Sequence, residues 1–347
     1  MFADIVLFTV GLALVLTIVV SAIGTVVLPH GVSTRLTRAV FRTTRKMATA
    51  YGRLDRSSRR QNKATQMSVA VGFVLLPMIW LGVAIAGYTF MFRSFGSPTW
   101  RGAYDLAGSS MLTLGFAKQD DLPSLTLSFT AAALTIALLA LLLVTYLPTI
   151  YQAYSAREVG LTAFETVAGE PPNVTAMIVR LHRIDGLERL HGLWEGSRHW
   201  FAELRESHTA LPAVAFLASS RHDRSWVATV GIMLDAASLS IAVIDVPPDP
   251  DAALCIRAGS FALRDIAEYF GVDVDHDPAP DHPISIDRAQ FDAAYDQLRA
   301  EGVPVRDRDE SWTAWSGWRV NYDAALVGLG RLTATRSMQL SGANAAV

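Results

Sequence analysis

Three long uncharged runs dominate the hydrophobic pattern of this 347-residue chain. They cover residues 5–28, 64–92 and 122–156, which are 24, 29 and 35 residues long. A helix needs about 20 apolar residues to cross the hydrocarbon core of a bilayer. Each run therefore has the length of a membrane span, and the sequence predicts an all-α membrane protein with three transmembrane helices.

The segment between the first two runs is strongly basic. Residues 30–63 carry ten Lys and Arg side chains against one acid, Asp55. Positive charge of this kind is retained in the cytoplasm, which places the N-terminus outside. No Lys or Arg precedes the first run, so a signal peptide is disfavoured. The basic segment has apolar residues at helical spacing and can bind anionic lipid headgroups as an amphipathic helix; a solvated linker is an equally good interpretation.

The gap between the second and third runs contains a short helical pattern followed by irregular sequence. Residues 101–112 predict a re-entrant helix, and residues 113–117 read Thr-Leu-Gly-Phe-Ala. Irregular backbone is tolerated at membrane depth only where protein buries it or water lines it. Gly115 supplies the unusual backbone angles that aim successive carbonyls at one axis. The pattern is typical of a pore loop; an ordinary external loop is the alternative.

These residues resemble the selectivity-filter signature Thr-Val-Gly-Tyr-Gly of the potassium channel family. The resemblance covers residues 64–154 and is to the bacterial type with two spans and one pore loop, here with an extra span in front. It implies that backbone carbonyls coordinate a permeant monovalent cation, K⁺, without any other cofactor. Because each chain has one loop, it also implies a homotetramer. The residues expected to coordinate the ion are Thr113, Leu114, Gly115, Phe116 and Ala117.

The signature is incomplete at its outer end. Ala117 stands where the family has its second glycine, and Lys118 stands where an aspartate commonly follows. Alanine disfavours positive φ, and four copies of Lys118 at the pore mouth repel cations unless Asp120 and Asp121 neutralise them. The sequence therefore predicts a degenerate filter.

A gate is expected near the cytoplasmic end of the third run. Leu143, Val144 and Leu147 can form a hydrophobic ring that closes a pore by dewetting. Pro148 follows at once and is a hinge in one interpretation, and the end of the helix in the other.

The rest of the chain predicts a mostly α-helical cytoplasmic domain. Helical spacing of apolar residues covers 174–206, 210–246, 252–270, 287–301 and 311–333. Residues 226–246 have the length of a fourth span, but the acid Asp235 in their middle favours a buried bundle helix. The expected organisation is a first span (1–29), a basic linker (30–63), a pore module (64–156) and the cytoplasmic domain (157–347).

Little in this domain points to catalysis or metal chemistry. Cys255 is the single cysteine, which excludes a disulfide framework and a cysteine-rich zinc site. Its histidines show no His-x-x-x-His pair of the kind that binds metal on a helix, although a histidine beneath a channel can sense pH. We expect no enzyme activity and no nucleic-acid partner.

The sequence thus predicts a cation channel subunit of the bacterial inner membrane. Two alternatives stay open. One is a non-conducting, channel-like membrane scaffold, and the other is a membrane-tethered signalling protein.

Overall fold

The computed structural model describes residues 1–26, 43, 58–219, 221, 224–247 and 249–333. The described chain is helical, and its one isolated β-bridge joins Ile244 to Val305. This confirms the all-α prediction. The chain divides into two compact units, Met1–Tyr151 and Gln152–Val347. Most of the predicted basic segment, residues 30–42 and 44–57, lies outside the described residues.

The first unit contains three helices long and apolar enough to cross a membrane, as predicted. Its elements are α1 (Phe2–Val26), α3 (Ser58–Ser94), α4 (Trp100–Met111), α5 (Leu122–Ala140), a π-helix (Leu141–Tyr146) and the first residues of α6 (Leu147–Ala168), most of which belongs to the second unit. The candidate spans are Phe2–Gly24, Leu75–Ser94 and Leu122–Ala168. The third candidate has 47 residues, which is more than the ~20 residues that a helix needs to cross a bilayer core. It continues well beyond the uncharged run that predicted it.

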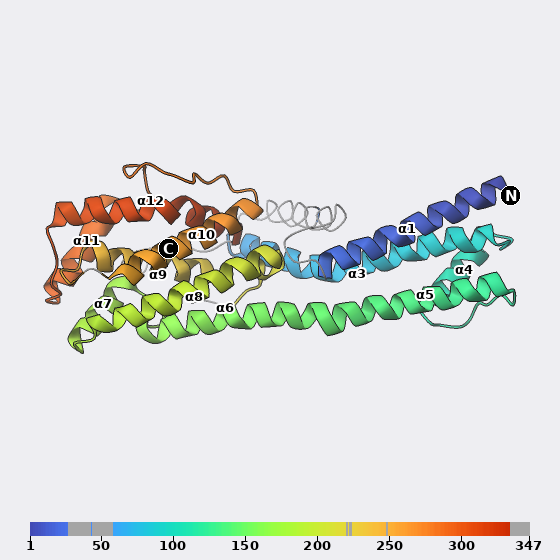
Figure 1. Ribbon diagram of the computed structural model, residues 1–347, viewed down its shortest axis with the longest axis horizontal. Coiled ribbons are helices and arrows are strands. Elements are labelled where there is room, and N and C mark those ends of the chain that lie inside the picture. The colour runs from blue at the N-terminus through green and yellow to red at the C-terminus, as the bar shows by residue number, and fades with distance from the viewer. Residues whose placement is uncertain (27–42, 44–57, 220, 222–223, 248, 334–347) are drawn as a thin grey trace. The chain divides into compact units, whose positions relative to one another are not determined.

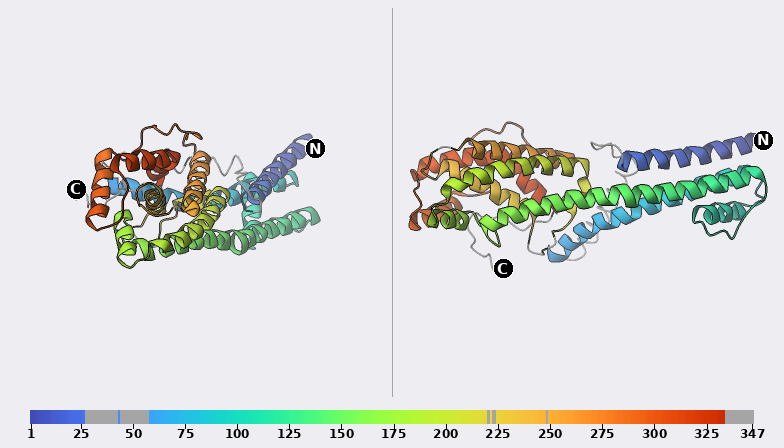
Figure 2. Two further views of the ribbon diagram at one scale, coloured as in Figure 1. Left: turned by 60° about the vertical axis from the view of Figure 1, so that its left-hand side comes forward. Right: turned by 60° about the horizontal axis from the view of Figure 1, so that its bottom comes forward.

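Helices α1 and α3 lie side by side and run in opposite directions (Figures 1 and 2). Two glycines permit their close approach: a Cβ added to Gly87 would lie 2.9 Å from the carbonyl oxygen of Gly11, and one added to Gly11 would overlap the carbonyl oxygen of Gly87. Further along, the buried indole N–H of Trp80 donates to the hydroxyl of Ser21 over 3.2 Å. Small residues and interhelical hydrogen bonds of this kind hold helices together in lipid.

The glycine contact can be tested with one added methyl group. Gly11→Ala forces α1 away from α3 and should lower the free energy of unfolding in mixed detergent micelles by about 1–3 kcal/mol. A Cβ on Gly82, which lies in the partner helix α3, meets nothing within 4 Å. Gly82→Ala is therefore the matched control and should leave stability unchanged or slightly raised; equal losses in the two variants would contradict the contact.

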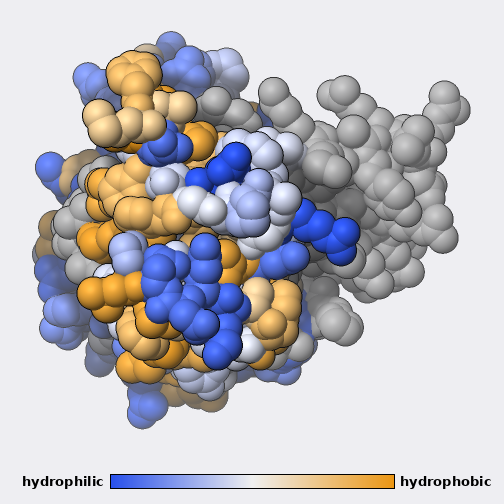
Figure 3. Space-filling view, turned by 90° about the vertical axis from the view of Figure 1, so that its right-hand side faces the viewer, coloured by the Kyte–Doolittle hydropathy of each residue, from blue (hydrophilic) through white to orange (hydrophobic). Residues whose placement is uncertain are grey.

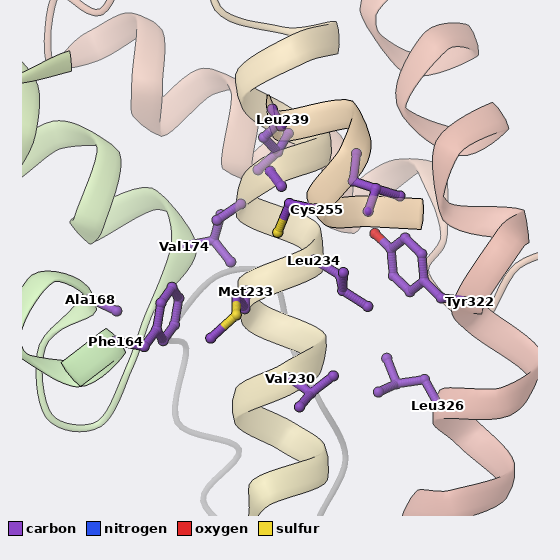
Figure 4. Packing of buried hydrophobic residues seen from close by; sticks show 14 of the residues in the cluster. Phe164, Ala168, Val174, Val230, Met233, Leu234, Leu239, Cys255, Tyr322 and Leu326 are labelled. Carbon is purple, nitrogen blue, oxygen red and sulfur yellow. The ribbon is translucent and has the colours of Figure 1, made fainter. Parts of the chain in front are cut away.

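The second unit is a helical bundle arranged around α9 (Trp226–Ala242). The surrounding helices are α6, α7 (Val174–Arg183), α8 (Leu190–Ala210), α10 (Pro250–Tyr269), α11 (Arg288–Ala300) and α12 (Arg308–Thr333). In Figure 4, Val230, Met233 and Leu234 of α9 lie between Phe164 of α6 and Tyr322 of α12. The interpretation of this stretch as a buried bundle helix is confirmed.

The charge inside α9 is neutralised by α12. Asp235 is 5% exposed and accepts hydrogen bonds from the guanidinium of Arg319 and, over 2.8 Å, from the hydroxyl of Tyr322. Arg319, itself 1% exposed, also donates to Asp323 over 2.9 Å. Burial raises the pKa of Asp235, and the charge of Arg319 opposes that shift. The ion pair connects residues 84 positions apart and fixes how α9 and α12 face each other.

Removing one partner of this pair should be costly. Arg319→Met leaves a buried carboxylate without a counter-charge, so we expect a loss of about 3–5 kcal/mol in the free energy of unfolding, measured by urea titration of the full chain in detergent. Arg183→Met removes an ion pair to Glu301 whose side chains are 65% and 38% exposed. That control should cost less than about 1 kcal/mol, and a similar loss in both variants would refute the role of Arg319.

Candidate functional site

Helix α4 stands between the end of α3 and the start of α5, and the structure confirms a short helix where the sequence predicts one. Its N-cap is Thr99, whose hydroxyl accepts the N–H of Gly102 over 3.0 Å. One face of α4 is buried in a core that it shares with α3 and α5. That core contains Ala84, Tyr88, Met91 and Phe92 of α3, Ala103, Leu106, Ala107 and Met111 of α4, and Leu127 and Ala131 of α5.

Helix α4 does not continue the direction of α3. From the end of α3 the chain turns back through α4, and residues 112–121 then return to the same end of the unit, where α5 begins (Figures 1 and 2). The shared core reaches Ala84 of α3 and Ala131 of α5. At about 1.5 Å per residue, these positions are roughly 15 Å along each helix from the C-terminal end of α3 and the N-terminal end of α5.

One serine of α4 holds the returning segment. Ser109 is 1% exposed. Its carbonyl accepts the N–H of Leu114 over 2.9 Å. Its hydroxyl accepts the N–H of Ala117 over 3.0 Å and donates to the carbonyl of the same residue over 3.2 Å. The segment from Leu114 to Ala117 is therefore fastened at both ends to a single buried residue, a role that sequence analysis did not assign.

Two residues of the segment have left-handed backbone. Gly115 has φ = 71°, as its glycine permits, but Thr113 has φ = 55°. That conformation is unusual for a β-branched residue and costs of order 1–3 kcal/mol. The hydroxyl of Thr113 donates to the carbonyl of Leu112 over 2.8 Å, which offsets part of the cost. Strain of this kind concentrates at functional sites.

Four consecutive carbonyls in this segment, those of residues 113–116, accept no hydrogen bond from the described part of the chain. The side chains of Leu114 and Phe116 are also 61% and 66% exposed. The arrangement can therefore offer backbone oxygens to a cation.

The predicted pore-mouth residues adopt separate roles. Lys118 and Asp120 form an exposed ion pair at 3.7 Å. Asp121 instead caps α5: it accepts the N–H of Ser124 over 3.0 Å, and that bond lowers the pKa of the Asp121 carboxyl. The hydroxyl of Ser124 donates to the side-chain oxygen of Gln119 over 3.2 Å. The face that carries these residues, viewed in Figure 3, mixes hydrophilic and hydrophobic side chains.

The predicted gate residues fall on an irregularity of the third candidate span. Leu143 and Val144 lie in the π-helix, and Leu147 and Pro148 begin α6. The N–H of Leu147 bonds to the carbonyl of Leu142, five residues back. Proline cannot donate this bond and would collide with a preceding carbonyl in a regular α-helix, and a π-turn is one way to absorb the mismatch. Pro148 thus does not end the helix, so that interpretation is wrong.

The three apolar side chains at this place are exposed within a single chain. Leu143, Val144 and Leu147 are 58%, 74% and 57% exposed. They are therefore available to line an opening or to contact lipid or another chain.

The second unit contains one group of side chains that could hold a metal, among the described residues. His191 of α8 faces Asp249 and Asp251 at the start of α10, with Nδ1–oxygen distances of 3.1 and 3.5 Å. Arg198 also lies 3.9 Å from Asp251, so a protonated His191 and Arg198 already balance the two carboxylates. The group is an exposed ion-pair cluster. Sequence analysis missed it because its partners are 58 residues apart.

The cluster makes His191 easier to protonate. The hydrogen bond and charge of Asp249 raise the pKa of His191 above its usual 6.5. The stabilisation is fully present below about pH 6.5 and is lost as the pH rises through the higher pKa of the folded chain. Asp249→Asn keeps the helix cap but removes the charge, so the pKa of His191 should fall when it is measured by NMR titration. An unchanged value would contradict the pairing.

His208 is a core histidine. It is fully buried beside Trp226, and burial lowers its pKa to about 3. Its ring therefore stays neutral at physiological pH.

No family model, curated protein or solved structure matches this chain.

Proposed function

We propose that this chain is one subunit of a membrane cation channel in which residues 113–116 form the ion path. The observation that carries the proposal is the set of four consecutive free carbonyls that follows α4. A dehydrating cation needs oxygen ligands to replace its water shell, and backbone carbonyls supply them in K⁺-selective pores. An ion path gives such unpaired carbonyls a function and accounts for the strained backbone of Thr113.

The packing of α4 supports a re-entrant pore helix. Its buried face shares a core with parts of α3 and α5 that lie well inside the candidate spans. Its C-terminal end, which carries a partial negative charge, leads directly into the free carbonyls. A cation held by these carbonyls would be stabilised by that charge.

Assembly of several chains completes the proposed pore. One loop supplies oxygens from one side only, so the ion path needs other copies around an axis, and we propose a homotetramer. In an apolar 18-residue stretch of the third candidate span, 11% is buried within the chain, compared with 28% and 39% in such stretches of the first two. Most of that stretch is therefore available for contact with other subunits, with lipid and with the pore.

The proposal includes four further assignments. The permeant ion is a monovalent cation, K⁺ by resemblance, and Ala117 and Lys118 make the filter degenerate. Leu143, Val144 and Leu147 are the gate, positioned by the π-turn before Pro148. The membrane is a bacterial inner membrane with the N-terminus outside and the second unit in the cytoplasm, and the basic segment 30–63 binds anionic lipid.

The proposal is tested by K⁺ flux from proteoliposomes containing the full chain. Gly115→Ala should reduce flux at least about tenfold, because a left-handed alanine costs about 1–2 kcal/mol in every subunit. Gly108→Ala is the control: it lies within α4, and a Cβ there meets nothing within 4 Å. Its flux should equal that of the natural protein. A natural protein that passes no cation under any voltage, pH or lipid condition refutes the proposal.

A channel-like scaffold that does not conduct is the second candidate. The observation that favours it is Lys118, whose side chain is 80% exposed and lies 3.7 Å from a carboxylate that is itself 90% exposed. Solvent weakens such a pair, so four ammonium groups could oppose cation entry. Flux that is absent from the natural protein and present in the double variant Ala117→Gly with Lys118→Asp would establish the scaffold in place of the channel.

A further inference from the structure

Ala117 differs from the four residues before it in what its backbone contacts. Both its N–H and its carbonyl are bonded to the hydroxyl of Ser109, at 3.0 and 3.2 Å. Its φ is not in the left-handed region. Ala117 stands at the position of the second glycine in the filter signature. Its carbonyl is already hydrogen-bonded to a side chain of α4 and is therefore not free to turn.

Ser109 is well placed to keep this contact. Its side chain is buried, in a helix whose neighbouring residues Ala107 and Met111 are fully buried. Its own carbonyl accepts the N–H of Leu114, so the same residue anchors the segment at a second point. Ser110 differs: its carbonyl accepts the N–H of Thr113 over 3.2 Å, and its hydroxyl is not among the partners of Ala117.

We infer that Ser109 is a positioning residue for ion selectivity, an inference that rests on the proposed channel function. By its hydrogen bond, Ser109 keeps the carbonyl of Ala117 away from the ion path. The ion path then contains the four carbonyls of residues 113–116. Selectivity in carbonyl-lined pores depends on the number of coordinating oxygens and on how freely they move. The hydroxyl of Ser109 lowers the number of available oxygens by one. It also restricts the motion of the neighbouring carbonyls. Ser109 does this without touching the ion.

Loss of the hydroxyl should release the outer end of the segment. In Ser109→Ala, the amide of Ala117 has no side-chain acceptor, and its carbonyl becomes free to move toward the ion path. Ser109→Thr retains a hydroxyl at the same position. Ser110→Ala removes a hydroxyl one residue further along and is the matched control.

Two measurements on the full chain in lipid test the inference. Hydrogen exchange of residues 113–117 reports the contact itself; we expect exchange at Ala117 to be faster by about fivefold or more in Ser109→Ala, because its N–H loses a side-chain acceptor. The reversal potential with K⁺ on one side and Na⁺ on the other reports selectivity. We expect the permeability ratio to change about threefold or more in Ser109→Ala, and to remain at the natural value in Ser110→Ala and Ser109→Thr.

The outcomes separate this inference from the proposed function. Unchanged exchange at Ala117 overturns the contact. Faster exchange with a permeability ratio that changes by less than threefold, while the protein still conducts, reduces Ser109 to a structural role and overturns the inference but not the channel. A natural protein without cation flux overturns the channel and, with it, the selectivity role of Ser109.

Discussion

An unpaired backbone carbonyl would be expensive in hydrocarbon, and the part of the chain that the structure describes offers no hydrogen-bond donor to four successive carbonyls that follow α4. The first unit is arranged around that constraint. Helix α4 returns along α3 and α5, its buried face gives it a fixed position in their shared core, and Ser109 fastens the segment that carries the carbonyls. In a membrane, these oxygens would need water, a neighbouring chain or a cation as a partner. The proposed channel would bring all three to them.

The second unit also contains a buried polar group that needs a partner, in this case a charged side chain. Its central helix is apolar enough to resemble a membrane span, yet Asp235 is buried in it. Arg319 and Tyr322 of α12 satisfy that carboxylate from the other side of the bundle. A pairing of this kind contributes little net stability compared with apolar packing. It does specify a single register between α9 and α12, because any other register would leave a buried charge without its partner.

Much of the architecture could be predicted from the sequence because it depends on local composition. Uncharged runs identify the candidate spans, and Asp235 identifies α9 as a bundle helix. The stretch 174–206 was predicted as one helical pattern, but the chain breaks after α7, where Asp185 has φ = 50° and the N–H of Gly186 caps the helix by bonding to Leu181. The Asp-Gly pair was the signal for that turn. The contact of Ser109 with Ala117 could not be predicted, because it depends on how residues 112–116 fold back.

The π-turn before Pro148 has a consequence for motion. Such a turn is an α-helix with one residue inserted, and each residue of an α-helix advances the side-chain direction by about 100°. If the insertion migrated along the helix or were absorbed, every side chain between its old and new positions would swing by about that angle while the helix axis stayed nearly straight. Val144 and Leu143 could exchange places on the same face. A constriction built here could thus be opened by a shift of register, with no need for the helix to bend.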